Sequence, residues 1–190
     1  MPAVVALLRA VNVGSANRVP MPELRAALEG AGFTGIQTLL QSGNVVCRSN
    51  LRTSSAIERR IGQVLRERCD VDVDVFVRTA SQWRSIVSGN PFRIESERDP
   101  AHLVVMVFAS PVSASAAARL QASIKGRERL VVDGAHGYIV YPDGIGTSRL
   151  TAAVIERSLE TRGTARNWNT VIKLERLLAA ERDARAPGPL

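Results

Sequence analysis

Polar side chains that could bind a ligand are concentrated in residues 164–170, near the C-terminal end of the chain. This stretch places Arg166, Asn167, Trp168 and Asn169 between threonines. Burying such hydrogen-bonding groups without partners would cost about 1 to 3 kcal/mol each, so they must bond one another, water or a ligand. The stretch therefore predicts either a ligand site that uses Arg166 and Asn167 or a structural latch between helices.

Residues 141–149 form a second candidate site, with the sequence Tyr-Pro-Asp-Gly-Ile-Gly-Thr-Ser-Arg. They join a predicted strand to a helix that we expect to begin at Ser148. Backbone amides and the positive end of that helix would favour an anion beside Ser148 and Arg149. The segment lacks the spacing of a Walker loop, and the alternative is that Thr147 or Ser148 only caps the helix.

Polar residues also stand where predicted strands end. Arg9 and Asn12 lie at the end of the first strand, and Ser42 and Asn44 flank Gly43 between two others. Each alone is ordinary strand-end or turn chemistry. Our leading hypothesis is that they join the two candidates above in a polar cleft between two halves, which binds a small anionic or phosphorylated ligand. The predicted ligand-binding residues are Arg9, Asn12, Ser42, Asn44, Ser148, Arg149, Arg166 and Asn167.

Residue types that build catalytic and metal sites are few in this chain. Cys47 and Cys69 are the only cysteines and His102 and His136 the only histidines, and their spacing matches no metal site. Neither histidine has a sequence neighbour that indicates a hydrolase triad. Residues 70–81 lack the glycine and the glutamate of a calcium loop. We therefore predict no metal or cofactor, and the sequence leaves open whether the protein is an enzyme.

Composition bounds the class of protein. The 190 residues are 45% hydrophobic and 4% aromatic, and the net charge is +7. Such a chain can form one large domain or two small halves, and its charge favours polyanionic partners unless the arginines only solubilise the surface. Two isolated cysteines, no signal-like N-terminus and no apolar span of about 18 residues predict a cytoplasmic protein without a membrane segment. The hydrophobic pattern of the sequence does not indicate an oligomeric state.

Hydrophobic periodicity predicts the elements that position these residues. In the first half the order is strand, helix, strand, strand, helix, strand, which is the ferredoxin-like order. A capping box of Ser55 and Glu58 predicts the start of the second helix, and alternating acids predict that the last strand begins at Asp70. The expected elements are strands 4–11, 36–40, 44–48 and 70–77, with helices near 22–31 and from residue 55.

The second half repeats this order and ends in an additional helix. Its expected elements are a short helix 81–87 and a loop, then strand 102–109, helix 113–124, strands 129–133 and 138–141, helix 148–161, an extended segment 164–167 and a last helix. The predicted fold is α+β, with two ferredoxin-like (βαββαβ) halves in tandem. The predicted domains are residues 1–78, a helical linker and loop at 79–101, a second half at 102–182 and a frayed tail at 183–190.

An RNA-recognition sheet would carry aromatic side chains on its central strands. Strands 4–11 and 44–48 have none, and Tyr138 and Tyr141 are wrongly spaced to share a strand face. The rival hypothesis is therefore an Arg-rich interaction module that docks nucleic acid or a protein partner without a stacking platform, with the polar motifs as latches.

Five motifs in the same order carry a resemblance to a known family: residues 6–14, 19–21, 41–46, 141–146 and 164–171. With these motifs the chain resembles the bacterial family of unknown function DUF1697, over almost its whole length. Arg149 stands where the family pattern has Lys, and Ser15 where a second Gly is common. The resemblance implies a compact bacterial cytoplasmic α+β protein and supplies no substrate, reaction or cofactor.

Overall fold

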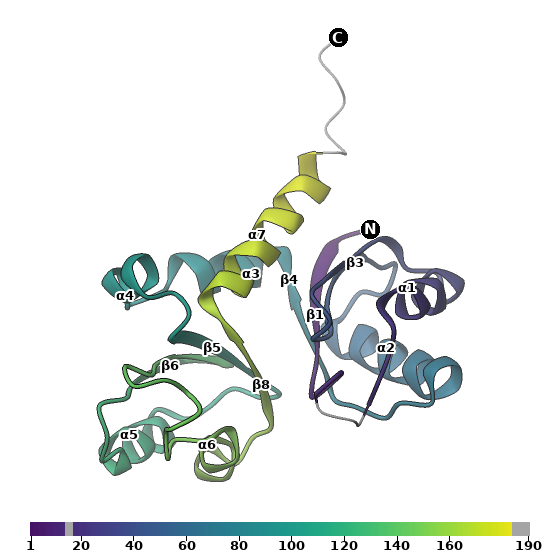
Figure 1. The fold of residues 1–190 in the computed structure, drawn as a ribbon. Coiled ribbons are helices and arrows are strands. Elements are labelled where there is room, and N and C mark those ends of the chain that lie inside the picture. Colours follow the sequence, from purple (N-terminus) through teal and green to yellow (C-terminus); the bar gives the residue numbers. More distant parts are fainter. Residues whose placement is uncertain (14–16, 184–190) are drawn as a thin grey trace. The chain divides into compact units, whose positions relative to one another are not determined.

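The chain divides into two compact units, which are described separately below. The computed structural model describes residues 1–13 and 17–183. Unit 1 contains residues 1–85 together with the chain from Lys173 onward, and unit 2 is Ile86–Ile172. The unit boundary falls inside α3 (Ala80–Ser88) and inside α7 (Trp168–Asp183) (Figure 1). Residues 184–190 of the predicted tail, and Ser15 of the family motif, lie outside the described residues.

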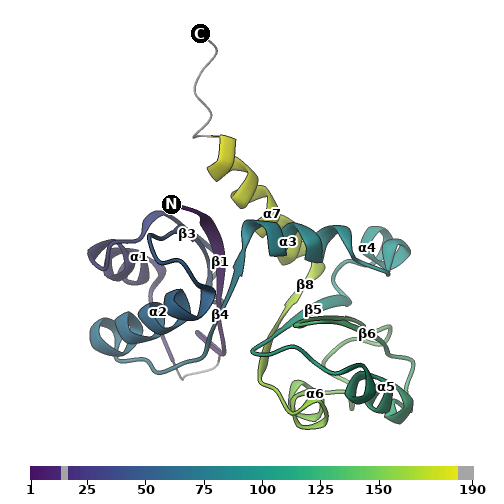
Figure 2. The same ribbon diagram turned by 180° about the vertical axis from the view of Figure 1, so that it is seen from behind.

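Unit 1 contains a four-stranded antiparallel sheet with the strand order β2-β3-β1-β4. Its elements are β1 (Ala3–Leu8), α1 (Met21–Gly30), β2 (Thr34–Leu39), β3 (Asn44–Arg48), α2 (Ser54–Cys69) and β4 (Val75–Thr79). Both helices cover the same face of the sheet (Figures 1 and 2). Alternate residues of β1 pack with them, because successive side chains of a strand point to opposite faces. Val4, Ala6 and Leu8 thus share one core cluster with Leu24 and Ile61.

After a short helix of its own, unit 2 repeats the order of strands and helices of unit 1 and its pattern of pairing. Its sheet has the order β6-β7-β5-β8, again with antiparallel neighbours. The core is built from Val104, Met106 and Phe108 of the central strand with Leu120 and Ile155 of the helices. The elements are α4 (Arg93–Arg98), β5 (Leu103–Phe108), α5 (Ala114–Ser123), β6 (Arg129–Asp133), β7 (His136–Val140), α6 (Ala152–Leu159) and β8 (Gly163–Asn167).

The fold is α+β, as predicted, with seven helices and two four-stranded antiparallel sheets among the described residues. The helix predicted near 22–31 is α1, with Pro22 in its first turn, and the strand predicted at 129–133 is β6. The extended segment before the last helix pairs with β5 as the fourth strand of its sheet. The short helix α4 lies in the segment that was predicted as a loop. Within the described residues, no helix has the length and apolar character needed to cross a membrane.

The predicted capping box at the start of α2 is wrong. Thr53 is the N-cap, and its hydroxyl accepts a hydrogen bond from the Ala56 amide. Glu58 instead accepts a hydrogen bond of 2.8 Å from the Val77 amide of β4. The local pattern of a hydroxyl followed by an acid therefore predicted the wrong cap, because the Glu58 carboxylate bonds an amide 19 residues away in the sequence.

The strand predicted at 70–77 begins five residues later in the structure, at Val75. Asp70 has a φ of 52° and forms the left-handed C-cap of α2, with its amide bonded to the Leu65 carbonyl. A left-handed residue at this position is a common helix end. The chain is consequently not extended at residue 70, and only Val75–Thr79 pairs with β1. The alternation of acids was thus a poor guide to where the strand begins.

Candidate functional site

The eight predicted ligand residues fall into two sets. Arg9, Asn12, Ser42 and Asn44 belong to unit 1, and Ser148, Arg149, Arg166 and Asn167 belong to unit 2. The expectation that both sets line one cleft stays a prediction. The contacts of each set within its own unit show which side chains already form hydrogen bonds or ion pairs that stabilise the fold.

Asn12 holds two loops of unit 1 together. Its Nδ2 donates to the Val19 carbonyl at 3.0 Å and to the Gln41 carbonyl at 2.6 Å, and its Oδ1 accepts from the Val19 amide at 2.8 Å. These bonds use both donors and the acceptor of the carboxamide. Arg9 lies three residues earlier and pairs with Asp74 at 3.3 Å. Asn12 is thus a latch between the loops that follow β1 and β2.

Asn44 and Ser42 form the inner wall of the β2–β3 turn. Asn44 is fully buried, and its Nδ2 donates to the Leu39 carbonyl and to Ser42 Oγ, each at 2.9 Å. Gly43 between them has a φ of +69°, and a β-carbon at this position would lie 2.7 Å from Leu8 Cβ. This motif therefore contributes to the stability of the hairpin in unit 1.

Arg166 and Asn167 end β8 and precede α7. Arg166 Nη1 donates to Thr164 Oγ1 at 2.9 Å and to the Ala165 carbonyl at 2.8 Å. Burial lowers the pKa of this guanidinium to about 10. Asn167 Oδ1 accepts hydrogen bonds from the amide and the hydroxyl of Thr170, both at 3.0 Å. Asn167 is therefore the N-cap of α7.

Asn167→Ala is expected to destabilise the protein by about 1 kcal/mol, the usual loss when a helix loses its cap. Asn167→Asp should keep most of that stability, since a carboxylate accepts the same bonds and is favoured near a helix N-terminus. Urea unfolding followed by circular dichroism measures both. Equal stability of Asn167→Ala and the native protein would contradict the capping role.

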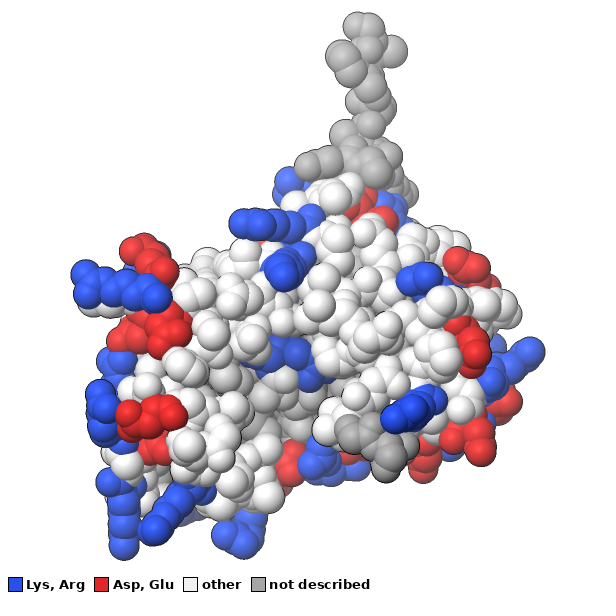
Figure 3. All heavy atoms as spheres, in the orientation of Figure 1, with Lys and Arg blue, Asp and Glu red and all other residues white. Residues whose placement is uncertain are grey.

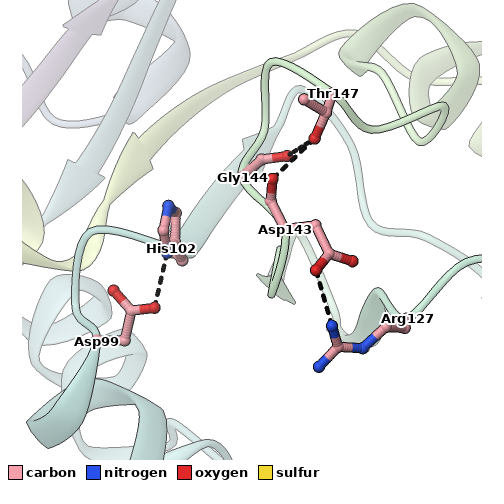
Figure 4. A network of polar contacts seen from close by, with 6 residues as sticks. All are labelled: Asp99, His102, Arg127, Asp143, Gly144 and Thr147. Atoms are coloured by element: carbon pink, nitrogen blue, oxygen red, sulfur yellow. Dashed lines mark hydrogen bonds and ion pairs between the residues drawn. The ribbon is translucent and has the colours of Figure 1, made fainter.

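The predicted helix start at Ser148 is wrong, and this changes the second candidate site. Helix α6 begins at Ala152, and its cap is Thr151, whose hydroxyl accepts from the Val154 amide. Residues 141–150 are instead a loop, closed by Thr147 Oγ1 on the Asp143 carbonyl at 2.8 Å and on the Gly144 carbonyl at 3.1 Å (Figure 4). The positive end of the helix is therefore not at residue 148.

The same loop lines a pocket of about 420 Å³ in unit 2, which we call the Arg149 pocket. Arg149 and Thr147 come from the loop, Lys125 and Glu128 from the segment after α5, and Leu150 with other apolar side chains lines the remainder. Its full lining is Ser123, Ile124, Lys125, Gly126, Glu128, Thr147, Arg149, Leu150 and Val154.

The Arg149 pocket carries two basic groups and one acidic group. Ser148 Oγ donates to Glu128 Oε1 and also accepts from the Leu150 amide at 3.0 Å. The hydrogen bond from Ser148 lowers the pKa of Glu128. Lys125 and Arg149 are exposed, and neither forms an ion pair with any described residue. These two cations are therefore available to an anion.

A second pocket of unit 2, of about 430 Å³, was not predicted; we call it the His102 pocket. Its lining is Glu95, Asp99, His102, Arg127, Arg129, Val140 and Pro142. His102 Nδ1 lies 2.6 Å from Asp99 Oδ2, and Arg127 Nη1 lies 2.7 Å from Asp143 Oδ1 (Figure 4). An acid three residues before the histidine was the signal that could have indicated this pair. Among the described residues, no group of three His, Cys, Asp or Glu side chains could hold a metal ion.

Both tyrosines of the chain are buried in unit 2. Tyr138 donates to the Ile86 carbonyl at 2.7 Å and Tyr141 to the Leu150 carbonyl at 3.0 Å. Burial, followed by the nearby charges of Asp133 and Glu128 respectively, raises the pKa of each tyrosine to about 12. Neither ring is therefore available for a base to stack on.

Tyrosinate absorbance gives a test of this burial. Because the ordinary pKa is about 10, about 10% of tyrosine should be ionised at pH 11 in the folded protein, against about 90% in urea. A pKa that folding raises stabilises the protein below the unfolded pKa, and that stability is lost as pH rises from about 10 to about 12. Ionisation of either tyrosine near pH 10 without unfolding would contradict the assignment.

Comparisons with known proteins agree with this geometry at the level of the fold. The family model described as "Protein of unknown function (DUF1697)" matches residues 1–138. The solved structure of a conserved bacterial protein from Streptococcus pneumoniae is similar, with a TM-score of 0.70 and 18% sequence identity. The match covers 93% of this chain and 98% of that one. None of the curated proteins compared with the chain matches it.

Proposed function

The chain belongs to the DUF1697 family, which is described as of unknown function, and we propose from its own residues that it binds a small anionic ligand in the Arg149 pocket. One observation carries the proposal. Lys125 and Arg149 line the same pocket, and neither has an ion-pair partner among the described residues. An unpaired Arg beside a Lys favours a phosphate or carboxylate, because guanidinium and ammonium groups form charge-assisted hydrogen bonds with both.

The size of the pocket and its other lining residues also favour a small ligand. A volume of about 420 Å³ lies within the range of small-molecule sites. Ile124, Leu150 and Val154 supply an apolar wall, whereas the Thr147 hydroxyl already donates to backbone carbonyls of its own loop. Glu128 is held by Ser148 and would repel an anion placed against it. We therefore expect the charged end of the ligand at Arg149 and an uncharged portion at the apolar wall.

Calorimetry and thermal shift with inorganic phosphate, pyrophosphate, ribose 5-phosphate and citrate test the proposal. A ligand at about 100 times its Kd adds about 2.7 kcal/mol of stability, which is a rise in Tm of about 5 to 10 °C. Arg149→Ala should weaken binding about tenfold to 100-fold, the loss of one charged hydrogen bond of about 1.5 to 3 kcal/mol. Arg149→Lys should retain part of the affinity.

Arg119→Ala is the matched control, because Arg119 is an exposed residue of α5 in the same unit and does not line the pocket. It removes the same charge, so it should leave saturable binding unchanged. Binding that Arg119→Ala weakens as much as Arg149→Ala would mean that net charge, and not this pocket, attracts the anion. Absence of saturable binding by any of the four compounds would contradict the proposal.

The rival function is an interaction module that docks nucleic acid or protein through arginines. On the face drawn in Figure 3, basic side chains are scattered among acidic ones and do not form one continuous stripe. A long polyanion needs such a stripe to neutralise successive phosphates. Binding of long single-stranded nucleic acid that falls steeply with salt and is insensitive to Arg149→Ala would favour the rival.

We also infer that each unit is one ferredoxin-like half. The strand orders β2-β3-β1-β4 and β6-β7-β5-β8, each with two helices between the strands in the same places, support this. The equivalence makes the loops of the two units comparable. The β7–α6 loop of unit 2, which carries Arg149, corresponds to the segment of unit 1 between β3 and α2.

A further inference from the structure

Asp99 and His102 form a carboxylate–imidazole pair that the proposed anion site does not use. His102 Nδ1 lies 2.6 Å from Asp99 Oδ2, so Nδ1 carries the proton that this short bond requires. That tautomer leaves a lone pair on Nε2. No group among the described residues bonds Nε2. A carboxylate that orients an imidazole and stabilises its cation is the arrangement that makes histidine an effective base.

The backbone holds the pair in place from both sides. Asp99 ends α4, where its amide bonds the Glu95 carbonyl at 2.9 Å. The His102 amide bonds the Asp99 carbonyl at 3.1 Å, and the His102 carbonyl accepts from the Tyr141 amide at 2.9 Å. The backbone of His102 is therefore fixed to a helix end and to the residue after β7, and the bond to Asp99 orients the ring, which limits the loss of entropy when it acts on a bound molecule.

Space in front of Nε2 is kept open by a glycine. A β-carbon at Gly144 would lie 3.7 Å from Nε2, and the φ of Gly144 is +87°. The side chains of His102 and Asp99 are 43% and 52% exposed, so a ligand can reach the ring. The pocket that His102 lines, of about 430 Å³, is large enough for a small molecule.

Charged groups around the imidazole limit the substrate. Asp99 is the nearest, and Glu95, Arg127 and Arg129 line the same pocket. Arg129 already pairs with Glu95 and lies 5.0 Å from the centre of the Phe92 ring, whereas Arg127 is 73% exposed and holds only Asp143. One ionised group can therefore replace Asp143 on Arg127. Transfer of a phosphoryl group needs several unpaired cations, which this pocket does not offer.

We propose that the Asp99–His102 pair is a general base that hydrolyses a carboxylic ester bearing one further ionised group. His102 Nε2 takes a proton from a water molecule while the water oxygen bonds the ester carbon. The tetrahedral adduct then breaks its bond to the alcohol oxygen, which takes the proton from Nε2. The products are a carboxylic acid and an alcohol, and no other reactant is needed.

Carbethoxylation by diethyl pyrocarbonate measures the reactivity of the Nε2 lone pair. The reagent's carbonyl carbon bonds the ring nitrogen and ethyl carbonate leaves, so the rate reports a free lone pair. The chain has two histidines, and Nε2 of the other, His136, contacts Tyr138 Oη at 3.1 Å. Peptide mass spectrometry should show His102 reacting at least about tenfold faster than His136, and Asp99→Asn should slow His102 about tenfold or more. Equal rates at His102 with and without Asp99 would overturn the proposal.

Hydrolysis of mono-p-nitrophenyl succinate tests the reaction itself, with p-nitrophenyl acetate as the uncharged control. The native protein should turn over the succinate ester faster than the acetate ester. His102→Gln should lower kcat/KM at least about tenfold, and Arg127→Ala should raise KM for the succinate ester alone. Turnover unaffected by His102→Gln would overturn the proposal. The Arg149 pocket is not involved, so phosphate binding in His102→Gln reports separately on the anion site.

Discussion

Replacing Gly43 by alanine is expected to destabilise unit 1 by about 2 to 5 kcal/mol. Gly43 has a φ of +69°, where a β-carbon costs about 1 to 2 kcal/mol. That carbon would also lie 2.7 Å from Leu8 Cβ and 3.3 Å from Val11 Cβ, both in the core. Forcing extra volume into a packed core adds about 1 to 3 kcal/mol. Leu8 cannot move away easily, because its amide bonds the Gly43 carbonyl at 2.8 Å.

Gly32→Ala separates the two causes. Gly32 belongs to the same unit and has a φ of +88°, but no atom lies within 4 Å of the point that a β-carbon would occupy there. The substitution should therefore cost only the backbone contribution of about 1 to 2 kcal/mol. Urea unfolding, with hydrogen exchange of β1 and β3 peptides as the unit 1 readout, compares the variants. If Gly43→Ala is no less stable than Gly32→Ala, the close packing against Leu8 is not what requires glycine.

Replacing Glu181 by alanine is expected to cost about 3 kcal/mol, although Glu181 lies near the end of α7. Its Oε2 accepts from Arg48 Nε at 2.8 Å and its Oε1 from Gln37 Nε2 at 2.7 Å. Arg48 also donates to the Glu181 carbonyl. The two charged side chains are only 17% and 14% exposed. Removing one partner of such a buried pair leaves the other charge unpaired, which costs about 3 to 5 kcal/mol.

Two further variants show whether the charge or the hydrogen bonds matter. Glu181→Gln keeps one oxygen that can accept a hydrogen bond but removes the charge. Its free energy of unfolding should therefore lie between that of the native protein and that of Glu181→Ala. Asp72→Ala removes a pair with Arg66 in which the side chains of Arg66 and Asp72 are 53% and 77% exposed, and it should cost less than about 1 kcal/mol. Unfolding in urea measures all three. Similar losses for Glu181→Ala and Asp72→Ala would show that the Arg48 pair is not a buried one.

The Arg48–Glu181 pair also explains why residue 35 is a glycine. A β-carbon at Gly35 would lie 2.7 Å from Glu181 Oε2, and its φ is +58°. The C-terminal part of α7 therefore packs over β2 where only glycine leaves room for the carboxylate. The two residues are far apart in sequence, and neither has a neighbour in the sequence that indicates this contact.

The elements of the fold were largely readable from the sequence, because they depend on neighbours along the chain. Apolar spacing and turn residues indicated α1, the β2–β3 hairpin and β6, and the order of elements indicated the α+β class. The family motifs were readable for the same reason. Local signals failed at Glu58 and at Ser148, where the true caps are Thr53 and Thr151. Several hydroxyl side chains lie near each helix start, and tertiary contacts determine which of them caps the helix.

The roles of the polar residues were decided only by the tertiary structure. Asn12 and Asn167 were predicted to bind a ligand, yet Asn12 bonds the backbone of two loops and Asn167 Oδ1 accepts from the amide and the hydroxyl of Thr170. Lys125 carried no local signal, and the only one at His102 was the acid three residues before it. The fold places Lys125 in one pocket with Arg149 and bonds His102 to the Asp99 carboxylate. Whether a polar side chain is used by the fold or left for a ligand depends on donors and acceptors that folding brings from elsewhere in the chain. Neighbouring residues along the chain were therefore enough to predict most of the elements and the family, whereas the packing of those elements sets which side chains remain free for a ligand or a reaction.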